Sequence, residues 1–251
     1  MPADILPGAE PFSASNGPHG VLVLHGFTGS PQSMRPLAEA FADAGFNVEL
    51  PLLPGHGTSV EDMIPTRFAD WSAAAEAAYL GLAARSDRML VAGLSMGGTL
   101  SCWLAAKHGE IAGLVLVNPL LQPPAASFRE ILTGVLASGA ATAPGVGSDI
   151  KKPDTEELAY EASPIEAVLS LFEATDELSP RLSDIGCPVL LLSSRDDHVV
   201  PSESGDLLVE RAGGPVERVW LEQSYHVATL DNDQAEIEER AVAFALKAVA
   251  S

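Results

Sequence analysis

Short, wholly apolar runs alternate with helical patterns along most of the chain. Residues 20–24 (GVLVL) and 113–117 (GLVLV) are two such runs, and segments with apolar side chains at helical spacing separate the runs. A strand with one face in water alternates apolar and polar residues, whereas a strand covered on both faces does not. The pattern therefore predicts an α/β fold with a mostly parallel central sheet flanked by helices.

One long region of the chain lacks this alternation of predicted strands and helices. The predicted strands are residues 20–24, 47–50, 88–92, 113–117, 188–192 and 217–221, and the predicted helices are residues 34–44, 68–84, 98–108, 202–211 and 235–249. Residues 119–185 instead carry weak helical patterns, proline pairs and glycine-rich turns. Because this gap is too long for an ordinary loop, we expect one domain over residues 1–251, with a cap inserted at about residues 119–185.

Charge and hydropathy exclude several classes of function. The 251 residues hold 14 Lys and Arg against 34 Asp and Glu, a net charge of −20. Such a chain repels nucleic acid and anionic lipid. No apolar run reaches the 18 or so residues of a membrane span, and the first residues lack the pattern of a signal peptide. We expect a cytoplasmic monomer or homodimer without stable membrane insertion, whose cap touches a lipid interface only transiently.

Residues 93–97 (GLSMG) form the one G-x-S-x-G pattern of the chain. A predicted strand precedes it and a predicted helix follows, which is the setting of a nucleophile elbow. Glycine is expected two residues before and after the serine because the turn is tight. Ser95 is therefore the candidate nucleophile. The alternative is that Ser95 is only a polar N-cap of the following helix.

A serine nucleophile needs a histidine base. Three histidines follow Ser95 in the sequence: His108, His198 and His226. His226 comes directly after the last predicted strand, where a loop at the carboxyl edge of the sheet would present it to Ser95. We therefore assign His226 as the base, with an ordinary loop histidine as the alternative.

The acid is expected after the strand at residues 188–192. Two adjacent aspartates lie there, Asp196 and Asp197. In hydrolases with the chain order Ser, Asp, His, the acid usually stands four residues before the proline of a D-x-x-V-P turn, here Pro201. This spacing favours Asp197 and makes Asp196 a turn residue.

Two backbone N–H groups are needed to bind the oxyanion of an acyl-transfer intermediate. The residue after the nucleophile, Met96, supplies one. The turn at residues 25–30 (HGFTGS) follows an early strand, and Gly26 there leaves the Phe27 N–H as the second. The histidines are scattered and the cysteines lack C-x-x-C spacing, so no metal pattern appears and we expect no cofactor.

The chain resembles the bacterial monoacylglycerol lipase and carboxylesterase family of the α/β-hydrolase superfamily, from about residue 20 to 249. The matching pieces occur in the family's order: HGFTGSP at 25–31, LPGHG at 53–57, AGLSMGG at 92–98, DHVVP at 197–201 and SYHVATLD at 224–231. The resemblance implies a triad of Ser95, Asp197 and His226, with Phe27 and Met96 as the oxyanion donors.

Residues 147–154 (GSDIKKPD) and 156–161 (EELAYE) resemble the cap of bacterial monoacylglycerol lipases. In those caps a glutamate contacts the glycerol hydroxyls, and the matching residue is Glu157, next to Glu156. The alternative is that Glu157 lies on the solvated face of a short cap helix.

The expected function is hydrolysis of monoacylglycerols to glycerol and fatty acid through an acyl-enzyme. A broad carboxylesterase for short- to medium-chain esters is the alternative, and a non-catalytic protein that binds a small ligand is a more distant one. We expect residues 120–179 to lie over Ser95 and form an apolar tunnel for the acyl chain. The candidate lining residues are Leu120, Leu121, Phe128, Ile131, Leu132, Val135, Leu136, Ile150, Val168, Leu169, Leu171 and Phe172.

Overall fold

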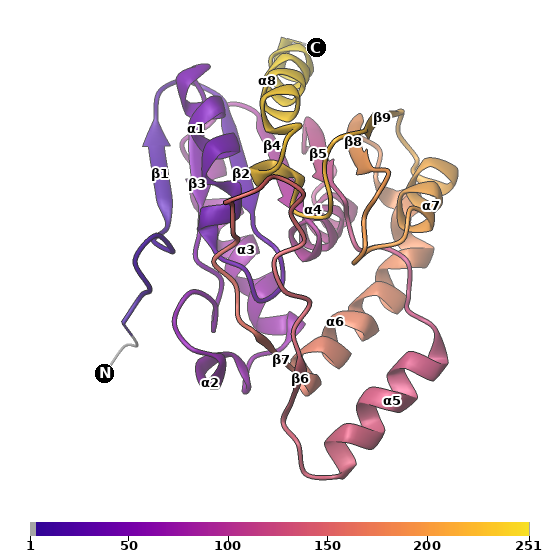
Figure 1. Ribbon diagram of the computed structural model, residues 1–251. Coiled ribbons are helices and arrows are strands. Elements are labelled where there is room, and N and C mark those ends of the chain that lie inside the picture. Colours follow the sequence, from indigo (N-terminus) through magenta and orange to yellow (C-terminus); the bar gives the residue numbers. More distant parts are fainter. Residues whose placement is uncertain (1–3, 251) are drawn as a thin grey trace.

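A seven-stranded sheet forms the centre of the computed structural model, which describes residues 4–250 (Figure 1). In spatial order the strands are β1 (Phe12–Ser15), β3 (Asn47–Leu50), β2 (Gly20–Leu24), β4 (Met89–Leu94), β5 (Gly113–Val117), β8 (Val189–Ser194) and β9 (Val216–Leu221). All neighbouring strands are parallel except β1 and β3. The carboxyl ends of six strands therefore meet at one edge of the sheet. The predicted mostly parallel sheet is confirmed.

Helices cover both faces of the sheet. The helices are α1 (Arg35–Asp43), α2 (Val60–Met63), α3 (Phe68–Ala83), α4 (Met96–Lys107), α5 (Ala126–Ala137), α6 (Ile165–Leu178), α7 (Glu203–Arg211) and α8 (Gln234–Ala250), with 3-10 turns η1 (Pro31–Met34), η2 (Ser179–Asp184) and η3 (Ala228–Leu230). Side chains of α1 and α8 pack with one set of strand residues, including Val21 and Val23. Side chains of α3 and α4 pack with the alternate set, including Leu22 and Leu24. This two-sided burial explains why strands β2, β4 and β5 are continuously apolar.

Two differences from the predicted elements are informative. The sequence pattern did not indicate β1, since this four-residue edge strand has alternating, only partly buried side chains and pairs with β3 alone. Helix α4 begins at Met96, two residues before the predicted start. The reason is that one residue, Ser95, makes the whole turn between β4 and α4.

The segment between β5 and β8 leaves the sheet and forms a separate group of elements. It contains α5, the two-stranded ribbon of β6 (Thr142–Pro144) and β7 (Ala162–Pro164), and α6. Leu132 of α5 packs with Ile165 and Phe172 of α6. Figure 1 shows this group beside the sheet, with a long connection between β6 and β7 that runs back toward the start of α8. Among residues 4–250, none of the helices combines the length and apolar character that crossing a bilayer requires.

Candidate active site

The loops at the carboxyl edge of the sheet bring the predicted site residues together. Phe27 follows β2, Ser95 follows β4, Asp197 follows β8 and His226 follows β9. Phe27, Ser95 and His226 line one pocket of about 350 Å³, together with Glu157. Asp197 lies behind His226 and holds its ring.

Ser95 occupies a backbone conformation that few residues other than glycine adopt. Its φ is 55° and its ψ is −116°, and such strain is concentrated at functional sites. A Cβ on Gly93 would lie 2.2 Å from the carbonyl oxygen of Gly97, and a Cβ on Gly97 would lie 2.1 Å from that of Leu24. Both glycines of the motif are therefore required. The Ser95 side chain makes no capping hydrogen bond to α4, so the alternative of a simple N-cap is wrong.

His226 and Asp197 form a buried hydrogen-bonded pair. His226 Nδ1 lies 2.8 Å from Asp197 Oδ2, and the two side chains are 8% and 5% exposed. Asp197 Oδ1 accepts the N–H groups of Val199 and Val200, both at 2.8 Å. With the carboxylate fixed in this way, His226 Nδ1 carries the proton and Nε2 retains its lone pair. The ring can then accept a proton through Nε2.

The competing acid and base candidates have other partners, although His198 also lines the pocket. Asp196 is 58% exposed at its side chain and lies 3.6 Å from the ammonium group of Lys151. His198 is equally exposed, and its Nδ1 pairs with Asp149 at 2.8 Å. Neither Asp196 nor His198 is hydrogen-bonded to Ser95, Asp197 or His226 within the described part of the chain.

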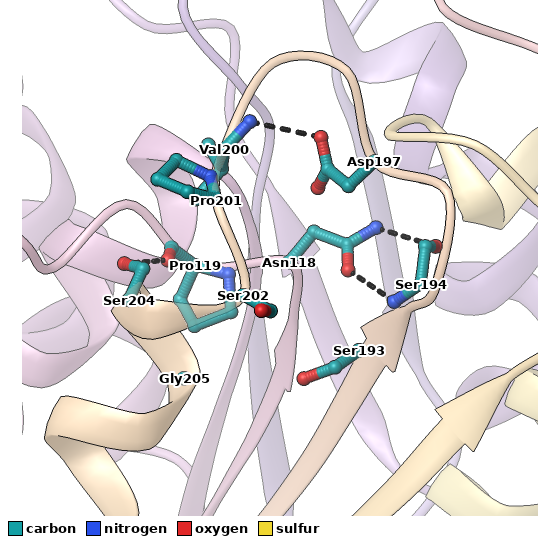
Figure 2. Close-up of a pocket in the computed structure, with 10 residues that line it drawn as sticks. All are labelled: Asn118, Pro119, Ser193, Ser194, Asp197, Val200, Pro201, Ser202, Ser204 and Gly205. Atoms are coloured by element: carbon teal, nitrogen blue, oxygen red, sulfur yellow. Dashed lines mark hydrogen bonds between the residues drawn. The ribbon is translucent and has the colours of Figure 1, made fainter.

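Asn118 supports the hydrogen-bonded pair of His226 and Asp197, and sequence reasoning missed it. It follows β5 with a φ of 44°, and its side chain points to the end of β8 (Figure 2). The Asn118 amide donates to Ser194 Oγ at 2.9 Å and to the carbonyl of His226 at 2.8 Å, and its oxygen accepts the Ser194 N–H at 2.7 Å. A polar residue directly after a buried strand, at the edge where the other site residues lie, was the available signal.

His25 orients one of the two candidate oxyanion donors. Burial lowers the pKa of His25 to about 4, so the ring is neutral at pH 7. Its Nδ1 contacts the Gly26 carbonyl at 2.9 Å, and its Nε2 accepts the Leu53 N–H at 3.2 Å. The Gly26 carbonyl and the Phe27 N–H belong to one planar peptide unit and point in opposite directions. Fixing the carbonyl therefore fixes the N–H.

The N–H groups of Phe27 and Met96 donate to no protein acceptor among residues 4–250. Both are thus available to a bound oxygen. Thr28, which follows Phe27 and also lines the pocket, has a φ of 61°. This second strained residue beside Ser95 agrees with a loop whose shape is imposed by the site.

The pocket wall beside Ser95 is mostly apolar. Six of the twelve proposed lining residues reach it: Leu120, Phe128, Leu132, Val168, Leu171 and Phe172. Two of the six residues that do not reach the pocket show where such apolar side chains lie instead. Ile150 packs against the buried cluster that includes residues of α1 and α8, and Ile131 of α5 is 62% exposed. Sequence hydropathy alone did not distinguish a pocket wall from the core of the segment.

Glu157 is the acidic group of the pocket. It lies in the connection between β6 and β7 and in no helix, so the alternative of a solvated helix face is wrong. Its carboxyl lies over the backbone of Gly29, where an added Cβ would come within 2.6 Å of Oε1. Burial raises the pKa of Glu157 to about 7, although nearby His226 and Ser33 favour the charged form. Glu156, by contrast, is exposed.

The raised pKa of Glu157 predicts a pH-dependent gain in stability for Glu157→Gln. The carboxyl loses its proton near pH 7 in the folded state but near pH 4.5 in the unfolded chain. The free energy of unfolding therefore falls progressively as the pH rises from about 4.5 to about 7, and the whole loss is present above pH 7. We expect the difference in free energy of unfolding between the variant and wild type to shift in favour of the variant by on the order of 2 kcal/mol from pH 4 to pH 8. Denaturant unfolding at the two pH values measures this, with Glu156→Gln, at the adjacent exposed position, as the matched control.

Comparison with known proteins places the chain in a family. The Hydrolase_4 model, described as serine aminopeptidase, S33, matches residues 18–233. The chain belongs to this S33 family. A thermostable monoacylglycerol lipase of Bacillus sp. (strain H-257) is 47% identical to this S33 protein over 246 residues, 97% of this chain and 96% of the relative. A carboxylesterase of Bacillus subtilis (strain 168) is 26% identical over 90% of this chain and 91% of its own length.

Solved structures of lipolytic enzymes are also similar to this S33 protein. A structure reported for the metagenome-derived lipolytic enzymes LipS and LipT superimposes with a TM-score of 0.93 at 44% identity, and covers 97% of this chain and 100% of that one. The monoacylglycerol lipase of Paleococcus ferrophilus has a TM-score of 0.79 at 18% identity, with 95% and 98% covered, which shows the fold alone. The resemblance to the α/β-hydrolase superfamily is confirmed, and the chain is a hydrolase.

Proposed function

We propose that this protein hydrolyses monoacylglycerols with Ser95 as nucleophile, His226 as base and Asp197 as the acid that orients it. The observation that carries the proposal is the convergence of three features on one pocket. Ser95 stands on a strained elbow, His226 is paired with Asp197, and Glu157 provides an acceptor beside an apolar wall. The lipase relative at 47% identity supports the substrate class.

The reaction follows from the positions of these groups. His226 Nε2 takes the proton of Ser95 as Oγ attacks the ester carbonyl, and Asp197 stabilises the imidazolium that forms. The N–H groups of Phe27 and Met96 bind the oxyanion. The imidazolium then protonates the leaving alkoxide, and glycerol departs. Water attacks the acyl-enzyme with His226 again as base, which releases the fatty acid and restores Ser95.

The inserted segment acts as a cap in this proposal. Residues of α5, α6 and the β6–β7 ribbon form the apolar wall that faces Ser95. A single acyl chain against this wall would lose its contact with water, which stabilises binding by about 0.8 kcal/mol for each buried methylene. A pocket of about 350 Å³ beside Ser95 suits one acyl chain, so we expect diacylglycerols and triacylglycerols to be poor substrates.

Glu157 is the proposed contact for the free hydroxyls of the glycerol moiety. A carboxylate accepts hydrogen bonds from hydroxyls, and a charge-assisted bond contributes about 1.5–3 kcal/mol. A methyl ester of the same fatty acid has no such hydroxyls. Glu157 therefore separates monoacylglycerol lipase from the second candidate function, a general carboxylesterase, which the 26% identical Bacillus subtilis relative favours.

The test is Glu157→Leu, assayed on a monoacylglycerol and on the methyl ester of the same acid. We expect kcat/KM on the monoacylglycerol to fall about ten- to a hundredfold while the methyl ester rate is nearly unchanged. Glu156→Leu, at the adjacent exposed position, is the matched control and should alter neither rate. Equal rates for wild type and Glu157→Leu on both substrates would favour the carboxylesterase.

A further inference from the structure

The connection between β6 and β7, residues 145–161, is fastened to the loop that carries His226. Asp231, just after that loop, accepts the N–H groups of Lys151 and Lys152 at 2.7 and 2.9 Å. Asp231 also accepts the N–H of Tyr225 at 2.9 Å. Figure 1 shows the connection reaching this region from the cap. The inserted segment and the histidine loop therefore share one set of buried carboxylate hydrogen bonds.

Asp149 makes the most direct of these contacts. Its Oδ2 accepts the backbone N–H of His226 at 3.0 Å, and its own carbonyl accepts the N–H of Val227 at 3.1 Å. Its carboxylate also accepts from the N–H of His198 at 3.2 Å and faces His198 Nδ1 at 2.8 Å. The side chain of Asp149 is only 13% exposed. The carboxylate is thus directed inward, toward the histidine loop.

Asp149 and Asn118 hold His226 from opposite sides of its backbone. Asn118, at the end of β5, donates to the carbonyl of His226 at 2.8 Å, while Asp149 accepts its N–H. The imidazole is held separately by Asp197. The inserted segment therefore supplies the hydrogen-bond partner of the His226 N–H, whereas loops of the sheet supply the partners of its carbonyl and its ring. A buried N–H without an acceptor is costly, so loss of Asp149 should shift this part of the loop.

We infer that Asp149 is a positioning residue, through which the inserted segment sets the placement of the His226 imidazole relative to Ser95. This inference rests on the proposed function, since it assigns His226 as the base. The pairing of Asp149 with His198 does not account for the buried carboxylate, because ion pairs with exposed partners contribute little. The buried Asp149 carboxylate points toward the N–H of His226, and this contact explains its inward direction.

The test compares Asp149→Ala with Asp149→Asn on a p-nitrophenyl ester. A shift of the base by about 1 Å can lower the rate by about a hundredfold, so we expect Asp149→Ala to lower kcat about ten- to a hundredfold with little change in KM. Asparagine can still accept the His226 N–H through its amide oxygen and face His198 Nδ1 with its NH2 group. Asp149→Asn should therefore retain kcat within about threefold of wild type.

A spectroscopic readout separates positioning from general destabilisation. The proton shared by His226 and Asp197 should give a downfield ¹H NMR signal, identified by its absence in His226→Gln. We expect this signal to broaden or move in Asp149→Ala and to persist in Asp149→Asn. Asp196→Asn removes an acidic side chain that also contacts this segment, through Lys151, without touching His226, and should change neither the signal nor kcat.

Two outcomes would overturn the inference. One is an Asp149→Ala enzyme with kcat within about twofold of wild type and an unchanged signal. The other is an equal loss of kcat in both Asp149 variants, with the signal retained in each. If Asp149→Ala does not fold, Asp149→Ser replaces it in the comparison. Failure of the triad assignment in the proposed function would look different, because wild type would then show no reaction of a fluorophosphonate at Ser95.

Discussion

Replacing Ser95 with alanine is expected to lower ester hydrolysis by about 10⁵- to 10⁶-fold, as expected for the nucleophile of a triad. Without Oγ no acyl-enzyme forms, and neither His226 nor the N–H groups of Phe27 and Met96 can substitute for it. The measurement is kcat/KM on a p-nitrophenyl ester, together with the mass of the protein after treatment with a fluorophosphonate. Wild type should gain one adduct, and Ser95→Ala none.

The Ser95 variant should keep its fold. Alanine at a φ of 55° is no more strained than serine, and the Ser95 side chain makes no hydrogen bond to the helix that would be lost. Far-UV circular dichroism should therefore match wild type. If Ser95→Ala retained more than about a thousandth of the wild-type rate, a different residue would have to be the nucleophile.

Asp197→Asn is expected to lower kcat about 10⁴-fold. Asp197 Oδ1 accepts the N–H groups of Val199 and Val200, so the asparagine would keep its oxygen there and turn its NH2 group toward His226. An NH2 group can only donate, so Nδ1 of His226 would become the acceptor and Nε2 would carry the proton. The imidazole could then no longer take the proton of Ser95.

Asp196→Asn is the matched control for that variant. It makes the same chemical change one residue earlier, at a side chain that is 58% exposed and contacts Lys151. Since exposed ion pairs contribute little, we expect its kcat to stay within about twofold of wild type. If Asp196→Asn were the more damaging of the two substitutions, the hydrogen bond between Asp197 and His226 would not be the functional one.

The central sheet could be predicted from the sequence because its signal is local. Strands β2, β4 and β5 are continuous apolar runs, and the helices on the faces of the sheet have a repeating apolar pattern. The position of Ser95 could also be predicted from the sequence, because the tight turn at this residue leaves no space for a side chain at positions 93 and 97, and both are glycine. The edge strand β1 had no such signal, because its half-exposed residues resemble those of a loop.

The order of Ser95, Asp197 and His226, each after a strand, was also sufficient to place them at one edge of the sheet. Parallel strands have their carboxyl ends on the same side, so strand order alone brings such loops together. Sequence spacing favoured Asp197 over Asp196. The structure shows the contact itself, a hydrogen bond of 2.8 Å from His226 Nδ1 to Asp197 Oδ2.

The sequence by itself determined the α/β fold, the elbow at Ser95 and the chain order of the candidate triad, because each depends on residues that are neighbours along the chain or on strand order. Only the tertiary structure decided the surroundings of His226 and Glu157. Asn118 and Asp149 reach His226 from positions 108 and 77 residues away in the chain, and the pKa of Glu157 depends on burial by segments remote in sequence. Contacts of this kind arise from packing between distant segments, which no local pattern of residue types records.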